Sequence, residues 1–400
     1  MTSPEHRAAE ATASPPYDLE AWRGQIPILR SYVPLNNCSQ APQTERTRAA
    51  AEAYLASWRR DGMDWEAWMA EVERARAAFA RLIHADPDEV AVTTSVSAAT
   101  ASLASALDFT GARRKVVVTE AEFPTVGHVW LAHRKYGAEV AWTPVRDGVV
   151  RLEDYDPVLD ERTVLVSATH AYYQNGFKQD LAALAGKVHA HGALLYVDAY
   201  QSLGVCPIDV KALGVDALAC GTLKFLMGTA GIAFLYVRRG LLERLHPAVT
   251  GWFGRADPFA FRVNALDWHD TARRFDTGTP PVINAYVARA GIETILDVGP
   301  ERIEAWTYEL GRRLVEGGRA RGLTIHGPAD PRRKTPTTAF VCGPASHEVE
   351  ARLRARGILA SARGPVIRLA PHFYNTPEEI DAALDALAEI LSTLSSPPAA

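Results

Sequence analysis

The chain has 400 residues, of which 48% are hydrophobic and 22% are charged, and its formal net charge at pH 7 is −4. This composition is typical of a globular protein that is large enough for one α/β core and a smaller second domain. The small charge gives no electrostatic basis for binding nucleic acid or a membrane surface, and no apolar stretch approaches the ~20 residues of a membrane helix. Four cysteines without C-x-x-C spacing predict neither disulfides nor a metal site, and they fit a cytoplasmic location.

Helical and strand patterns divide the chain into two domains between two tails. Strand-like runs alternate with helical stretches, which indicates a mostly parallel sheet with helices on both faces. The predicted strands are 89–94, 115–119, 163–168, 194–198, 217–220 and 232–237. After Pro280 and Pro281, a helix-rich region, two short strands and a final helix have the layout of a smaller C-terminal α+β domain. We therefore predict an α/β protein with a flexible tail over 1–25, a large domain over 26–283, the small domain over 284–393 and a flexible tail over 394–400.

The first strand of the large domain ends just before an Ala-rich helix that begins near Val96 and Ser97. A helix N-terminus presents free backbone N–H groups and the positive end of the helix dipole. Ser97 adds a hydroxyl donor, so this position suits a phosphate group. The alternative is that Ser97 only caps the helix.

Aromatic residues follow the next two strands. Phe123 ends one strand and is held by Pro124, so its ring either stacks on a planar heteroaromatic ligand or lies in the core. Strand 163–168 leads into His170 and Tyr173. We interpret His170 as a hydrogen-bonded structural histidine rather than a general base, and Tyr173 as part of a polar loop that faces a cofactor hydroxyl or the substrate.

Two later strands end near a carboxylate and a lysine that are both expected to be buried. An apolar run ends at Asp198, with Gln201 three residues on, and so delivers a carboxylate to the sheet edge where α/β folds bind ligands. Lys224 lies between two runs that we predict to be buried strands. A buried ammonium is costly unless it is consumed, and Schiff-base formation consumes it.

These motifs resemble those of fold-type I pyridoxal-phosphate enzymes of the class V aminotransferase and cysteine desulfurase superfamily, nearest to its kynureninase-like members. The resemblance spans roughly residues 36–391. It rests on the following stretches: Glu122-Phe123-Pro124-Thr125, Thr169-His170 with Tyr173 and Gly176, Asp198 with Gln201, Lys224-Phe225-Leu226-Met227-Gly228, Gly251-Trp252-Phe253-Gly254 with Pro258-Phe259, Arg274-Phe275 with Gly278-Thr279-Pro280-Pro281, and Ile367-Arg368-Leu369-Ala370-Pro371-His372-Phe373-Tyr374-Asn375.

The resemblance implies a role for each matching residue. Lys224 would hold pyridoxal 5′-phosphate as the internal aldimine and shuttle protons, and Asp198 would keep the ring nitrogen protonated. Arg368 would clamp the substrate α-carboxylate with a planar two-point fork. The other implied cofactor contacts are the N–H of Val96 and the hydroxyl of Ser97 at the phosphate, Phe123 on the ring face, Gln201 at the ring hydroxyl, Thr125 and Tyr173 in the same site, Trp252 near the phosphate, and Thr279 from the neighbouring subunit of an obligate homodimer.

Three positions depart from the pattern of the relatives. The stretch 357–365 contains no cysteine where persulfide-forming desulfurases carry one, and Ser361 is a poor nucleophile toward sulfur. Leu223 replaces a tyrosine that touches the phosphate in kynureninase-like members, and Arg255 replaces their usual histidine. These changes argue against a persulfide relay and against true kynureninase activity.

We predict from these residues an enzyme that binds an α-amino acid as an external aldimine and forms a Cα carbanion. Its most favoured reaction is cleavage of a C–S or Cβ–Cγ side-chain bond. Transamination and epimerisation remain alternatives because the same groups serve them, and a non-catalytic cofactor-binding homologue is a second alternative. A nicotinamide-dependent dehydrogenase ranks far behind, because no G-x-G-x-x-G follows a predicted strand.

Overall fold

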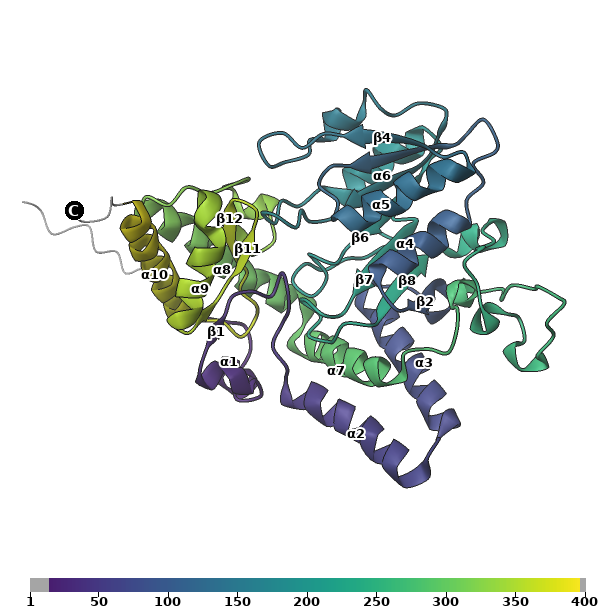
Figure 1. Ribbon diagram of the computed structural model, residues 1–400, viewed down its shortest axis with the longest axis horizontal. Coiled ribbons are helices and arrows are strands. Elements are labelled where there is room, and N and C mark those ends of the chain that lie inside the picture. Colours follow the sequence, from purple (N-terminus) through teal and green to yellow (C-terminus); the bar gives the residue numbers. More distant parts are fainter. Residues whose placement is uncertain (1–13, 396–400) are drawn as a thin grey trace, which may run out of the picture.

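The computed structural model describes residues 14–395, and a seven-stranded sheet forms its larger part (Figure 1). The strand order is β2-β8-β7-β6-β5-β3-β4. Neighbouring strands from β4 to β7 are parallel, whereas β8 is antiparallel to both β7 and β2. The strand bounds are β2 Val90–Thr93, β3 Lys115–Thr119, β4 Glu139–Thr143, β5 Thr163–Thr169, β6 Leu194–Asp198, β7 Ala217–Gly221 and β8 Ala233–Val237.

The two faces of this sheet are covered by different helices, because successive strand residues point to opposite sides. Val117 and Val197 share a buried cluster with residues of α3, α6 and α7, whereas Val116 and Tyr196 share a second cluster with residues of α4 and α5. Helix α2 packs beside α7. The helix bounds are α2 Glu45–Asp61, α3 Trp65–Leu82, α4 Val96–Ser105, α5 Pro124–Ala132, α6 Leu181–Ala190 and α7 Val282–Val298. The predicted α/β fold with a mostly parallel sheet is confirmed.

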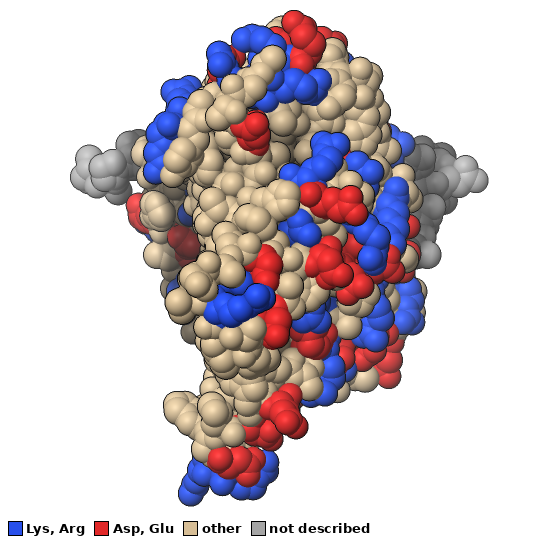
Figure 2. Space-filling view, turned by 90° about the vertical axis from the view of Figure 1, so that its right-hand side faces the viewer, with Lys and Arg blue, Asp and Glu red and all other residues tan. Residues whose placement is uncertain are grey.

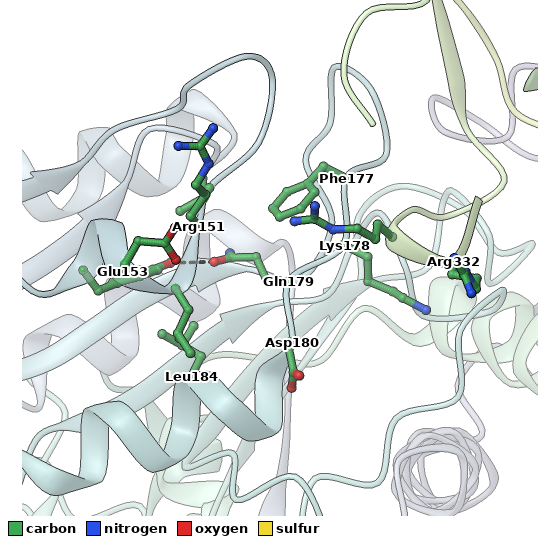
Figure 3. Close-up of a pocket in the computed structure, with 12 residues that line it drawn as sticks. Arg151, Glu153, Phe177, Lys178, Gln179, Asp180, Leu184 and Arg332 are labelled. Atoms are coloured by element: carbon green, nitrogen blue, oxygen red, sulfur yellow. Dashed lines mark hydrogen bonds between the residues drawn. The ribbon is translucent and has the colours of Figure 1, made fainter. Parts of the chain in front are cut away.

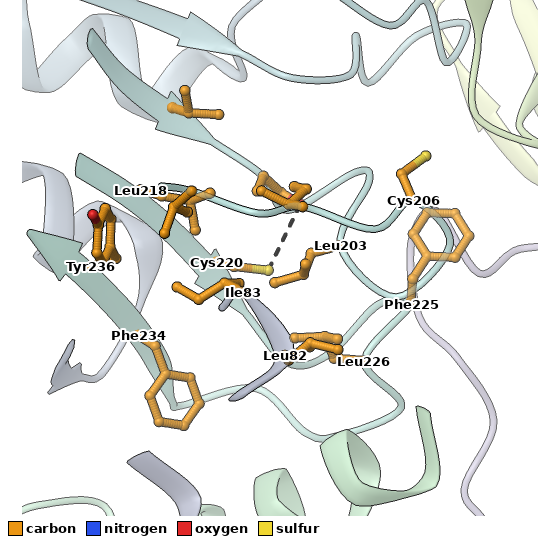
Figure 4. Close-up of a cluster of buried hydrophobic side chains, with 14 of the residues drawn as sticks. Leu82, Ile83, Leu203, Cys206, Leu218, Cys220, Phe225, Leu226, Phe234 and Tyr236 are labelled. Atoms are coloured by element: carbon orange, nitrogen blue, oxygen red, sulfur yellow. Dashed lines mark hydrogen bonds between the residues drawn. The ribbon is translucent and has the colours of Figure 1, made fainter. Parts of the chain in front are cut away.

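Hydrophobic packing fixes the backbone on both sides of Lys224 (Figure 4). Cys220 in β7 is buried, and so are Phe225 and Leu226, which directly follow Lys224. They belong to one cluster with Leu203. Fully burying a leucine or phenylalanine side chain stabilises the fold by about 1.5–3 kcal/mol. The lysine therefore extends from a segment that the core holds in place.

The C-terminal part forms a second, smaller body beside the sheet (Figure 1). A three-stranded antiparallel sheet of order β11-β12-β9 packs with three helices around a core that includes Trp306, Phe340 and Ile367. Its elements are α8 Pro300–Ala320, β9 Thr338–Val341, α9 Ser346–Ala355, β11 Ser361–Arg363, β12 Val366–Leu369 and α10 Pro377–Ser395.

The N-terminal segment packs on this smaller body instead of forming a tail as far as residue 25. Helix α1 (Leu19–Arg23) follows Tyr17, whose hydroxyl donates to the Phe373 carbonyl at 2.7 Å. Strand β1 (Val33–Pro34) pairs in parallel with β10 (Ile358–Leu359). The flexible-tail prediction is therefore wrong for residues 14–25, because hydrogen bonds and apolar contacts to a distant part of the chain order them. Residues 1–13 and 396–400 lie outside the described part.

Two further elements differ from the sequence prediction. Strand β4 at the sheet edge has no counterpart in it, and only one of its residues, Thr143, is fully buried. Helix α7 was assigned to the small domain, but Ala285, Ala288 and Ile292 belong to the cluster on the large sheet. In residues 14–395, no helix is long and apolar enough to cross a membrane.

Candidate active site

Four parallel strands deliver side chains to one edge of the sheet. From β3 the chain leads outward to β4 and then returns to β5 on the other side of β3, and such a reversal of strand order opens a crevice at the carboxyl ends. Phe123 follows β3 and Tyr173 follows β5, and their rings meet edge to face at 5.3 Å. Asp198 ends β6, and Lys224 follows β7. The structure thus brings together four of the residues predicted from sequence.

Lys224 lies between two aromatic rings. Its Nζ is 4.1 Å from the centre of the Tyr200 ring and 5.7 Å from that of Phe123. Burial lowers the pKa of Lys224 to about 8, although the nearby carboxylate of Asp198 opposes this effect. A substantial fraction of the amine is therefore neutral near physiological pH, as a nucleophile or a proton acceptor requires. Phe123 is 43% exposed, which contradicts the alternative that it is a core residue.

Asp198 is buried next to a second carboxyl group. Its Oδ1 accepts a hydrogen bond from the Tyr200 N–H at 2.8 Å. Burial raises the pKa of Asp198, while the Tyr200 N–H and Lys224 oppose that rise. Burial and the charge of Asp198 hold the pKa of Glu122 well above its usual range, and Glu122 Oε2 has no hydrogen-bond partner. A cationic group beside Asp198 would relieve this accumulation of buried acid.

The start of helix α4 provides backbone donors at the same edge. Ser95 is the capping residue, since its hydroxyl accepts from the Ala98 N–H at 3.1 Å. The alternative that Ser97 is the cap is therefore wrong. Val96 and Ser97 are the first two helical residues, so their N–H groups have no partner inside the helix. Ser97 is half-buried, and its hydroxyl remains a candidate phosphate donor.

A segment near the N-terminus closes the site, which sequence reasoning did not foresee. The N–H of Ala41 donates to the Leu223 carbonyl at 3.2 Å, and Gln201 Nε2 donates to the Cys38 carbonyl at 3.0 Å. Gln201 is thus tied to this segment. Apart from the small polar residues themselves, no sequence signal marks 38–41 as part of a site.

Arg368 is a buried residue of strand β12 in the small domain, and its side chain extends toward Tyr173 of the large domain. It is 1% exposed, and its positive charge contributes to the lowered pKa of Lys224. Its Nη1 donates to the Tyr173 carbonyl at 2.6 Å. Its Nη2 donates to the hydroxyls of Ser39 and Ser361 at 2.9 and 2.7 Å. The guanidinium is therefore anchored to both parts of the molecule.

Three other predicted residues lie at or outside the border of this group. Thr125 is half-buried in the first turn of α5, two residues after Phe123. Trp252 packs with other aromatic rings, among them Trp65 at 6.1 Å. Thr279 is exposed and lines a cavity of about 260 Å³. Within this single chain, neither Trp252 nor Thr279 is placed against Lys224.

The departures from the relatives also have definite positions. Ser361 begins strand β11, which pairs with β12, and residues 358–359 pair with β1, so most of the stretch 357–365 is strand and not an open loop. The side chain of Arg255 forms an ion pair with Asp267 at 2.6 Å. The backbone carbonyl of Leu223 accepts the hydrogen bond from Ala41 and so holds segment 38–41 at the site.

A larger cavity of about 700 Å³ lies elsewhere, where α6 begins and segment 331–333 approaches it (Figure 3). Arg151, Lys178 and Arg332 line it together with Glu153 and Asp180, so its walls carry mixed charge. The described residues that line this cavity include none of the predicted site residues. Its size alone therefore does not identify it as the catalytic centre.

The residues at the sheet edge fit pyridoxal 5′-phosphate. A primary amine with a lowered pKa lies between two aromatic rings, a buried carboxylate lies beside it, and a helix N-terminus is at the same edge. An aldehyde, a pyridine nitrogen and a phosphate are the groups that these three features suit.

Comparisons with known proteins agree with this chemistry. The family model described as Aminotransferase class-V matches residues 39–382. The uncharacterized aminotransferase YcbU of Bacillus subtilis is 39% identical over 369 residues, which cover 92% of this chain and 97% of that protein. A kynureninase of Deinococcus radiodurans is 35% identical over 250 residues, or 61% of this chain and 58% of the kynureninase. The apo structure of a cysteine desulfurase from Thermococcus onnurineus NA1 superposes with a TM-score of 0.85 at 24% identity, covering 96% of this chain and 100% of that one.

Proposed function

Because the chain belongs to the class-V aminotransferase family and is a pyridoxal-phosphate-dependent enzyme, we propose that it cleaves a side-chain bond of an α-amino acid. The bond is a C–S or a Cβ–Cγ bond. The observation that carries the proposal is the position of Lys224, whose amine lies between the Phe123 and Tyr200 rings beside Asp198 with a pKa of about 8.

We assign Lys224 and Asp198 as the catalytic pair. When bound, the cofactor supplies a protonated ring that draws electrons from the bond being broken at the substrate α-carbon. Asp198 keeps the ring nitrogen protonated, and this ion pair compensates its own buried charge. Lys224 holds the cofactor and moves the proton at the α-carbon, because an amine of this pKa both accepts and returns a proton near pH 8.

The remaining predicted residues orient the cofactor and the substrate. Arg368 contributes a fixed positive charge for the substrate carboxylate. The cofactor contacts are assigned as follows: Phe123 covers the ring face, Val96 and Ser97 hold the phosphate, Gln201 approaches the ring hydroxyl, and Thr125 and Tyr173 line the same chamber.

The enzyme acts as a homodimer in this proposal. Apolar side chains are exposed on helix α2, including Leu55 and Trp58, and on the stretch that follows Trp252, including Phe259, Phe261 and Val263. Charged side chains are sparser along one side of the view in Figure 2 than along the other. Large exposed apolar patches mark association surfaces. A second copy on this surface would bring Trp252 and Thr279 to the neighbouring site.

Transamination is the second candidate, because the 39%-identical relative is named an aminotransferase. The two reactions differ in their products. A side-chain lyase releases pyruvate or alanine from a β-substituted amino acid without an acceptor, whereas an aminotransferase needs a 2-oxo acid. We also propose a cytoplasmic location, since all four cysteines are unpaired.

Absorbance spectroscopy with product analysis tests the proposal. The purified protein, supplied with pyridoxal 5′-phosphate, is mixed with L-kynurenine, L-cysteine S-conjugates or L-alanine, and pyruvate, alanine and ammonia are measured. We expect a visible cofactor band and release of pyruvate or alanine from a β-substituted substrate. Lys224→Ala should abolish both, whereas Lys178→Ala, which alters a surface ion pair with Glu304, should retain both. Full activity of Lys224→Ala would refute the catalytic assignment.

A further inference from the structure

The guanidinium of Arg368 has most of its hydrogen-bond donors engaged within the protein. An arginine side chain carries five N–H donors. Nε donates to the Ser361 carbonyl at 3.4 Å, and Nη1 donates to the Tyr173 carbonyl at 2.6 Å. Both N–H groups of Nη2 meet hydroxyls, those of Ser39 and Ser361. One N–H on Nη1 is left for a ligand, whereas a two-point fork requires two parallel donors.

The two serine hydroxyls form a second donor group. Their Oγ atoms are 2.7 Å apart, and each accepts a hydrogen bond from Arg368 Nη2. One hydroxyl proton therefore lies between the two oxygens, and the other points away from the pair. Ser361 is 6% exposed, whereas Ser39 is half-buried. Either hydroxyl can donate within the pair, and when the more buried Ser361 donates, the outward-pointing proton is that of Ser39.

Ser39 belongs to the segment that packs against the Lys224 site. It follows Cys38, whose carbonyl accepts a hydrogen bond from Gln201. Two residues further on, Ala41 is bonded to the residue before the lysine. The serine pair therefore lies beside the Lys224 site, where a substrate joined to the cofactor would present its carboxylate.

We propose that Ser39 binds the substrate α-carboxylate together with Arg368, one oxygen meeting the Ser39 hydroxyl and the other the remaining Nη1 N–H. Ser361 is a positioning residue, because it donates to Ser39 and turns the Ser39 proton outward. The chain of hydrogen bonds from the guanidinium through Ser361 to Ser39 polarises the outer hydroxyl. This inference rests on the proposed function and adds a second residue, Ser39, to the recognition of the substrate carboxylate.

Ligand binding to the cofactor-loaded enzyme tests the inference without a turnover assay. The cofactor absorbance is followed while L-alanine, or its amide, is added to the wild type and to Ser39→Ala. A hydrogen bond to a charged group corresponds to an affinity change of about 10- to 100-fold. We expect Ser39→Ala to lose about that much affinity for L-alanine and less than threefold for the amide, which lacks the anion. Ser39→Thr keeps the hydroxyl and should retain affinity within threefold.

Two controls separate the possible causes of a change. Ser346→Ala removes a hydroxyl that binds the Gly364 carbonyl of the same hairpin without touching Arg368, and it should leave both affinities unchanged. Thermal unfolding of each variant reports its folding. Equal affinity of Ser39→Ala and the wild type for L-alanine, or an equal loss for the amide, would overturn the inference alone. A wild type without a cofactor band would instead refute the proposed function, and with it the role of Ser39.

Discussion

Lys334 allows a sharp test of the cost of burying a lysine in this fold. Its side chain is 5% exposed, and its Nζ donates to the Thr338 hydroxyl at 2.7 Å. Burial lowers the pKa of Lys334 from the usual 10.5 to about 7. At 1.36 kcal/mol per pKa unit, this difference reduces the folding stability by roughly 5 kcal/mol at low pH. The substitution Lys334→Met removes the amine while keeping a long side chain.

The sign of the pH dependence follows from the lowered pKa. Between pH 7 and 10.5 the unfolded chain keeps a proton on Lys334 that the folded protein releases, so the free energy of unfolding of the wild type rises with pH. Lys334→Met does not have this dependence. After the lost hydrogen bond is subtracted, we expect the variant to be more stable at pH 7 by roughly 2–4 kcal/mol. Near pH 10 the gain should fall close to zero.

Urea unfolding of the wild type and Lys334→Met at pH 7 and pH 10 measures how the stability difference between the two proteins changes with pH. The titration of all other groups is common to both proteins and cancels in this comparison. Lys178→Met is the matched control, because that lysine is half-buried and paired with Glu304 at 3.5 Å. Its effect on stability should be under about 1 kcal/mol at both pH values. A stability change in Lys334→Met that is equal at pH 7 and pH 10 would refute the reasoning.

Three other substitutions have definite expected results. In the wild type the guanidinium of Arg76 lies 2.7 Å from the buried carboxylate of Asp276. Arg76→Met removes this counterion and should lower the free energy of unfolding by about 3–5 kcal/mol. A loss under 1 kcal/mol in urea unfolding would contradict this. Phe123→Ala removes a ring face and should weaken cofactor binding by about 2- to 10-fold in an absorbance titration, so unchanged affinity would remove Phe123 from the site. Gly204→Ala should lower the melting temperature, since φ is +107° and the new Cβ would lie 2.4 Å from the Phe225 carbonyl oxygen; an unchanged melting temperature would show that the backbone can move there.

The family could be recognised from sequence, and the match to the class-V aminotransferase model over residues 39–382 confirms it. Asp198 and Lys224 are identifiable because each follows a short run of apolar residues. Such a run is typical of a strand that is buried on both faces, and it can be recognised from a few neighbouring residues. Their approach to one another was predictable too, since the carboxyl ends of parallel strands share one edge. The roles of the individual site residues stay predictions.

Contacts between distant segments were not predictable in the same way. The apolar face of helix α7 would be equally suited to packing in either domain. Only the packing in the structure shows that Ile292 faces the large sheet. Residues 14–25 have a composition typical of a tail, yet Tyr17 is bonded to Phe373. Ser39 and Ser361 are 322 positions apart, and no local pattern links them.

The sequence by itself therefore determined most strands of the large sheet and placed Lys224 and Asp198 near strand ends, because strand burial and a charge at a strand end are properties of a few neighbouring residues. Only the tertiary structure decided how the donors of Arg368 are used, why Glu122 keeps an unpartnered oxygen, and where Lys334 is buried. Hydrogen-bond partners and desolvation depend on which segments meet in space. That depends on the packing of the whole chain.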